Sequence, residues 1–181
     1  CQLSEISTIA IGAPIDHAFC CLGTTIKQAK TKSAFIAVDK TATIDFIRRC
    51  NAKLSFVVTA LGANPDSKQF YNRIKGETQA ALFSQFNEVI TDNAQRKLVI
   101  LQPSLLLGER QQKRRLEDLA QNLFKRLSPL FIGPLQQYQP IAGEKVADAV
   151  LNFALQPQML MAEFAHPSAK NCFIVPNKAM Q

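Results

Sequence analysis

The stretch Phe70-Tyr71-Asn72-Arg73-Ile74-Lys75-Gly76-Glu77 decides how the rest of the chain is interpreted. Tyr71 and Lys75 lie four residues apart, so on a helix they share one face with one turn between them. An ammonium beside a phenol stabilises the phenolate and lowers a tyrosine pKa that starts near ~10. Such a tyrosine can exchange a proton with a carbonyl or an alcohol near neutral pH. Taken alone, the same spacing is more often a solvated pair on a helix surface, so the assignment depends on the rest of the chain.

Around this stretch, short apolar runs alternate with segments of helical spacing. The apolar runs lie at 16–22, 54–59, 97–102 and 172–175, and the helical segments at 33–50, 67–83, 113–127 and 144–155. The first run shows no clean alternation, which is typical of a strand buried on both faces. Ser67 is placed to cap the helix that carries the pair. This order predicts βαβ units, and hence an α/β, doubly wound parallel sheet with helices on both faces.

Three polar turns follow three of the predicted strands. They are Gly23-Thr24-Thr25, Thr59-Ala60 and Pro103-Ser104. Ligands of open α/β sheets bind beyond the carboxyl ends of the strands, so these turns should meet in one crevice. Tyr71, one turn into the helix after the second of them, should face that crevice, and the Thr59 hydroxyl is expected to hold the same substrate oxygen.

Composition limits the class of protein. The chain has 181 residues, 47% of them hydrophobic and 19% charged, which predicts one folded domain over 1–181. No apolar run approaches the ~20 residues of a membrane span. Five cysteines form no Cys-x-x-Cys pair, so reduced thiols and a cytoplasmic location are expected, with Cys20 and Cys21 in the core. The two histidines lie far apart, and no metal site is predicted.

The formal charge of +7 raises the question of an anionic partner. Basic residues are spread along the chain, and their densest run, 110–126, has no interleaved aromatic residues on which bases could stack. A solvated basic helix face is the preferred interpretation, with attraction to an anionic ligand such as a phosphate as the alternative. No specific nucleic-acid partner is predicted.

Five motifs occur in order along the chain. They are Leu22-Gly23-Thr24-Thr25, Thr59-Ala60-Leu61-Gly62-Ala63, the stretch 71–77, the stretch 102–110, and Pro140-Ile141 followed by Val146-Ala147. Together they resemble the atypical short-chain dehydrogenases/reductases, which are similar to nucleoside-diphosphate-sugar epimerases. The nearest branch looks like the Tat-interacting oxidoreductases and their small bacterial relatives. The resemblance covers about residues 16–155.

The resemblance implies a Rossmann-like domain that binds NADP or NAD, with NADP slightly preferred. Tyr71 would exchange the proton at a carbonyl or alcohol substrate, helped by Lys75 and Thr59. The implied cofactor-binding residues are Leu22, Gly23, Thr24, Thr25, Lys75, Pro103, Ser104 and Leu105. Residues 129–181 would include a small substrate-side, C-terminal portion. A homodimer is compatible with this assignment.

The chain departs from the family pattern in three places. The Gly-x-x-Gly-x-x-Gly phosphate loop is absent, so about one βαβ unit is expected to be missing ahead of Cys1. Thr59-Ala60 stands where the family often has two serines, so the second hydroxyl is lost. Gln102 stands where an arginine is common, which removes a charge near the crevice.

The leading function is therefore an NAD(P)-dependent oxidoreductase acting on a carbonyl or alcohol carbon. The alternative is a non-catalytic nucleotide-sensing or partner-binding module of the same fold, with which the Thr59-Ala60 change is compatible. A nucleic-acid-binding protein is a third class, and only the net charge supports it.

Overall fold

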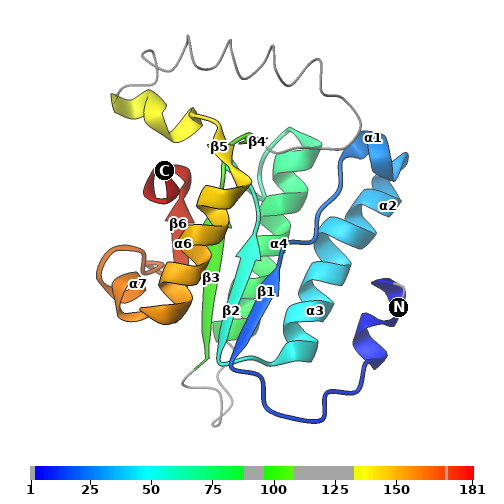
Figure 1. Cartoon of the computed structure of the whole chain (residues 1–181). Helices are drawn as coiled ribbons and strands as arrows, with labels where there is room; N and C mark the ends of the chain where they lie inside the picture. Colours follow the sequence, from blue (N-terminus) through cyan, green and yellow to red (C-terminus); the bar gives the residue numbers. More distant parts are fainter. Residues whose placement is uncertain (1–2, 88–95, 108–132, 170) are drawn as a thin grey trace.

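The computed structural model describes residues 3–87, 96–107, 133–169 and 171–181 (Figure 1). A parallel sheet lies at its centre, with strands in the order β1-β2-β3-β6. These strands are β1 (His17–Cys20), β2 (Leu54–Val58), β3 (Lys97–Gln102) and β6 (Cys172–Pro176). The predicted strands and their parallel arrangement are confirmed, and the fold is Rossmann-like.

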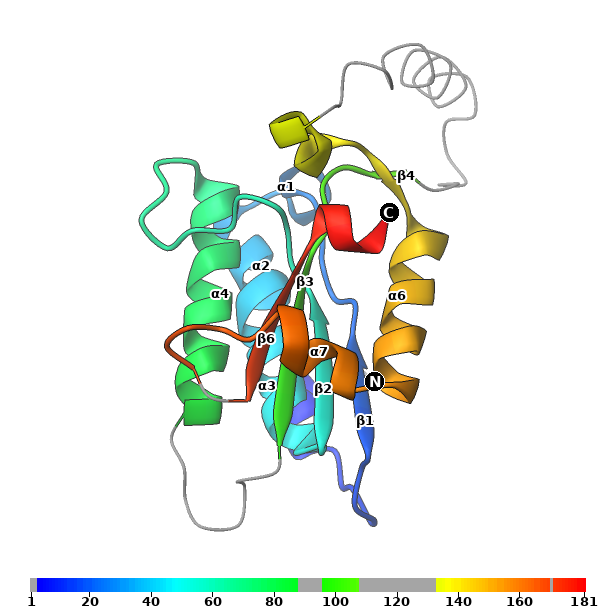
Figure 2. The same cartoon turned by 90° about the vertical axis from the view of Figure 1, so that its left-hand side faces the viewer.

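Helices cover both faces of this sheet (Figures 1 and 2). On one face lie α2 (Lys32–Ile36), the π-helical turn η2 (Ala37–Ala42), α3 (Thr43–Cys50) and α4 (Phe70–Asn87). On the other lie α6 (Gly143–Leu155) and α7 (Gln158–Glu163). The shorter elements are η1 (Leu3–Thr8), α1 (Ile26–Ala29), β4 (Leu106–Leu107), η4 (Gly133–Tyr138), β5 (Ile141–Ala142) and η5 (Asn177–Met180). The helices predicted over 33–50 and 144–155 are confirmed.

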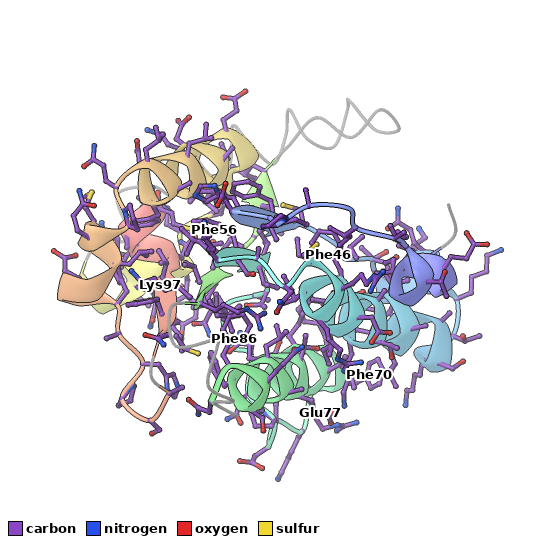
Figure 3. All side chains as sticks on the ribbon, turned by 90° about the horizontal axis from the view of Figure 1, so that it is seen from below. Phe46, Phe56, Phe70, Glu77, Phe86 and Lys97 are labelled. Atoms are coloured by element: carbon purple, nitrogen blue, oxygen red, sulfur yellow. The ribbon has the colours of Figure 1, made fainter. Side chains whose placement is uncertain are left out.

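Two apolar clusters hold the layers together. Phe56 of β2 belongs to the cluster on the α6 side and Phe86 of α4 to the cluster on the α4 side, and Figure 3 labels both. The buried strands β2 and β3 contribute alternate residues to each cluster, as Val99 and Ile100 illustrate. Burying a large aliphatic or aromatic side chain contributes roughly 1.5–3 kcal/mol, so these clusters fix the positions of the strand ends where the predicted site lies.

Three local predictions are wrong. The strand predicted to be buried on both faces alternates instead: Phe19 is 45% exposed while Ala18 and Cys20 are buried, because β1 is the edge strand and contributes no side chain to the cluster on the α6 side. Cys21 is exposed rather than in the core. The Ser67 hydroxyl accepts from the Gln69 amide in the turn before α4, so it does not cap that helix.

Two further points concern the helices. The basic helix predicted over 113–127 lies outside the described residues. Among the helices that are described, none is both long and apolar enough to cross a lipid bilayer.

Candidate active site

A cleft of about 1020 Å³ opens beyond the carboxyl ends of β1, β2 and β3. All ten residues that the sequence singled out line it: Leu22, Gly23, Thr24, Thr25, Thr59, Tyr71, Lys75, Pro103, Ser104 and Leu105. The parallel strands explain this, because their carboxyl ends meet at the same edge of the sheet and bring their loops together. Three loops that lie far apart in the sequence therefore form one continuous cleft with the start of α4.

Two hydrogen bonds, one from a backbone amide and one to a side-chain hydroxyl, hold the loop after β1 in place. The Thr24 amide donates to Asp39 Oδ2 at 2.9 Å, and the Thr25 hydroxyl caps α1 by accepting from the Gln28 amide at 3.1 Å. Gly23 leaves space in front of two charged groups: a Cβ built on it would lie 3.5 Å from Asp39 Oδ1 and 3.7 Å from Lys75 Nζ. A glycine here keeps the backbone accessible to a ligand.

Lys75 is the buried cation of the site. Its Nζ lies 2.7 Å from Asp39 Oδ1, and the side chains are 6% and 0% exposed. Oδ1 accepts no hydrogen bond, so the contact joins the charges without the alignment of a hydrogen bond. Burial of each charge is tolerated because the opposite charge lies beside it.

Tyr71 lies at the mouth of the cleft and is 37% exposed. Its ring packs on the fully buried ring of Phe35, with 5.8 Å between centroids, and Lys75 Nζ lies 5.9 Å from its centroid. Burial raises the pKa of the Tyr71 phenol, and the nearby Asp39 carboxylate raises it further. The sequence predicted a pKa lowered by Lys75, and that prediction is wrong here because burial, and after it the Asp39 carboxylate, raise the pKa of the phenol.

Thr59 lines the cleft, but its hydroxyl is already engaged. The hydroxyl donates to the Leu101 carbonyl at 3.1 Å and accepts from Gln79 Nε2 at 2.7 Å. Its one proton therefore points into the sheet, and the predicted role of holding a substrate oxygen is not supported by this geometry. Gln102 belongs to the same chain of bonds, because its Nε2 donates to Gln79 Oε1 at 3.1 Å. The glutamine that replaces the family's arginine thus has a structural role.

The loop after β3 is held from the far end of the chain. The Ser104 amide donates to Oδ1 of the buried Asn177 at 3.0 Å, and Asn177 Nδ2 donates to the Gln139 carbonyl at 2.8 Å. The Ser104 hydroxyl donates to the same carbonyl. These bonds fix Pro103 and Leu105 at the cleft wall without using a charged group.

Sequence reasoning missed Asp39 and Asn177. Asp39 could have been found, because it follows Phe35 by one helical turn and so shares the apolar face of the 33–50 helix, where an unpaired acid would be costly. Asn177 carries no such signal, since it lies in the tail, far in sequence from the loop it holds. In the part of the chain that is described, no group of three or more His, Cys, Asp or Glu side chains could hold a metal ion.

No protein-family profile matches the chain. It is 30% identical over 103 residues to protein FMP52, mitochondrial, of Debaryomyces hansenii, and 30% identical over 115 residues to protein HTATIP2 of Rattus norvegicus. The matches cover 56% and 62% of this chain but only 41% and 44% of those proteins. The chain thus spans less than half the length of these curated relatives.

Solved structures show the same fold at lower identity. A small-chain dehydrogenase covers 99% of this chain and 79% of its own with a TM-score of 0.54 at 14% identity. The acetoin dehydrogenase YohF of Salmonella typhimurium covers 92% of this chain and 65% of its own with a TM-score of 0.52 at 12% identity. The parallel sheet, its helices and these likenesses define a Rossmann-fold protein. The two sequence relatives and these structures are what the chain is similar to, in keeping with the resemblance of its five motifs to short-chain dehydrogenases/reductases.

Proposed function

We propose that this chain carries the catalytic pair of an NAD(P)-dependent oxidoreductase that acts on a carbonyl or alcohol carbon. One observation supports the proposal above the others: the cleft at the strand ends gathers Tyr71, Lys75 and three loops that the sequence singled out independently. In the described lining of this cleft, Lys75 and Asp39 are the only charged residues, so the polar chemistry is concentrated at the pair.

The residues present fit the nicotinamide ribose end of a dinucleotide. Lys75 would donate to the ribose hydroxyls, the open backbone at Gly23 would lie against the ribose, and Pro103 and Leu105 would border the nicotinamide. When bound, the cofactor supplies or accepts the hydride. The sequence offers no Gly-x-x-Gly-x-x-Gly loop for the pyrophosphate, so the fit concerns this end only. NADPH is expected to bind slightly better than NADH.

Tyr71 would supply the proton. Because burial and Asp39 raise the pKa of its phenol, the hydroxyl keeps its proton at neutral pH. A protonated phenol at the mouth of the cleft suits donation to a carbonyl oxygen as the alcohol forms, so carbonyl reduction is the favoured direction. Phe35, packed against the ring, would hold the hydroxyl in one orientation.

The test has two stages, binding and turnover. NADPH fluorescence should change on titration with the chain, and Gly23→Val should abolish the change while Gly143→Val, at a glycine with open space around it, should not. Tyr71→Phe should then lower carbonyl reduction by about 10²–10⁴-fold. Lys75→Met should lose activity, whereas Lys68→Met, at an exposed lysine before α4 begins, should retain it. Full activity of Tyr71→Phe would disprove the proton-transfer role.

A second function, nucleotide sensing without turnover, is favoured by one specific observation. The two groups that would assist Tyr71 are both engaged elsewhere, Lys75 by Asp39 and the Thr59 hydroxyl by the Leu101 carbonyl. NADPH binding that Gly23→Val abolishes, with no turnover on a broad panel of carbonyl and alcohol substrates, would establish this function in place of the first.

The compartment and assembly remain predictions. Cysteine usage favours the cytoplasm, although two FMP52 relatives are mitochondrial by name. Fractionation of cells expressing the whole protein would decide between these compartments, and sedimentation would test the homodimer.

A further inference from the structure

Asp39 occupies an unusual place in the fold. It lies in η2, a π-helical turn inserted between α2 and α3, and its side chain is fully buried. Single π-turns within α-helices are frequent at functional sites. Here the turn carries Asp39, which is one of the residues that line the cleft.

One carboxylate joins two separate parts of the site. Asp39 Oδ2 accepts from the Thr24 amide at 2.9 Å, while Oδ1 lies 2.7 Å from Lys75 Nζ. The Asp39 backbone is also fixed, because the Thr78 hydroxyl of α4 donates to its carbonyl at 3.2 Å. The loop after β1, the π-turn and α4 are therefore linked through one residue.

We propose that Asp39 is a positioning residue for the tyrosine–lysine pair: its carboxylate fixes Lys75 against the Gly23-Thr24 loop and neutralises the lysine's charge towards Tyr71. The inference rests on the proposed function only in taking Tyr71 as the proton-transfer group. Burial of the phenol is the larger cause of its raised pKa, and the Asp39 carboxylate adds to it by offsetting the attraction that the Lys75 charge, 2.7 Å from Oδ1, would exert on a phenolate.

Among the residues that the structure describes, few other charges lie near Tyr71. From α4, Lys75 lies near its ring, and Arg73 lies 5.8 Å from the ring of the neighbouring Phe70. From α2, Lys32 lies 5.4 Å from the same Phe70 ring. From η2, the charge of the Asp39 carboxylate raises the pKa of the phenol directly, and burial raises it more.

The chain permits a direct test, because it has only two tyrosines and no tryptophan. In a Tyr138→Phe background, Tyr71 is the only phenol, and its ionisation can be followed by ultraviolet absorbance of the tyrosinate without substrate or cofactor. Asp39→Asn keeps the shape of the side chain and an oxygen for the Thr24 amide but removes the charge. We expect it to lower the Tyr71 midpoint by about 1 pH unit or more.

Three comparisons make the result decisive. Asp45→Asn, which removes an acid on α3 outside the cleft lining, should leave the midpoint unchanged. Lys75→Met should raise the midpoint, and the Asp39→Asn/Lys75→Met double variant, which removes both charges, should return it close to that of the parent chain. An unchanged or raised midpoint in Asp39→Asn would overturn the inference.

If Asp39→Asn does not fold, the step from Lys75→Met to the double variant measures the same effect, and the absence of a downward step would overturn the inference equally. Because ionisation is read without turnover, a negative result here leaves the proposed reaction to its own test, and a failed reaction leaves this titration valid.

Discussion

Two ion pairs join the same two elements, η2 and α4, and they differ mainly in burial. The inner pair runs from Asp39 of η2 to Lys75 of α4, and the outer pair reverses the charges, from Lys40 of η2 to Glu77 of α4. Both have a separation of 2.7 Å, but the inner side chains are 6% or less exposed and the outer ones 32%. Glu77 is labelled in Figure 3. Equal separations should therefore have unequal consequences for stability, because solvent screens only the outer pair.

The largest expected effect comes from leaving one inner charge unpaired. Asp39→Leu should lower the free energy of unfolding by about 3–5 kcal/mol, because the Lys75 ammonium stays buried without its counter-ion. The Asp39→Leu/Lys75→Met double variant should recover most of that loss. Urea unfolding of the parent chain, both single variants and the double variant measures this. If Asp39→Leu lowers the free energy of unfolding by no more than about 0–1 kcal/mol, the inner and outer pairs do not differ in their contribution to stability.

A smaller effect should follow from disturbing the helix between the pairs. Gly76 separates Lys75 from Glu77, and a Cβ on it would lie 2.2 Å from the Asn64 carbonyl carbon and 2.3 Å from the Pro65 nitrogen. Backbone atoms move less easily than the end of a flexible side chain. Gly76→Ala should therefore lower the free energy of unfolding by about 1–3 kcal/mol through overpacking.

The control for this prediction is Gly143→Ala, where a Cβ meets nothing within 4 Å. That variant should be neutral or slightly stabilising, because alanine is the better helix former. Thermal unfolding of both variants decides the matter, and equal stability of the two would show that α4 can move away from the 64–65 turn.

The smallest effect belongs to the outer pair. Glu77→Gln should lower the free energy of unfolding by only about 0–1 kcal/mol, because both partners of the pair are a third exposed. The substitution also removes a longer contact, in which Arg73 Nε lies 3.8 Å from the other carboxylate oxygen of Glu77. Urea unfolding at low salt and at about 1 M salt should show that loss disappearing with salt. A salt-independent cost comparable to that of Asp39→Leu would mean that the outer pair is effectively buried.

Much of the fold follows from local patterns. The apolar runs over 54–59 and 97–102, and the helical spacing over 33–50, each depend on residues close in sequence, so the strands and helices could be predicted. The cleft followed from topology alone, because loops after parallel strands must meet. The resemblance then identified Tyr71 and Lys75 as the pair of interest.

The electrostatics of the site could not be predicted in this way. The Tyr71 pKa depends on burial of the phenol and then on Asp39, and Asp39 reaches Lys75 only when η2 and α4 pack together. The Thr59 hydroxyl donates its hydrogen bond to the carbonyl of Leu101, 42 residues further along the chain. Such contacts are set by packing across elements, which spacing within one segment does not reveal.

The hydrogen bond from Thr24 to Asp39 has a practical consequence for spectroscopy. An amide that donates to a carboxylate makes a charge-assisted bond, and its proton resonance is sensitive to the charge on the acceptor. A single amide signal, that of Thr24, should therefore report the state of the Asp39–Lys75 pair throughout a titration. Any ligand that draws Lys75 away from Asp39 should move this signal even without touching the loop itself.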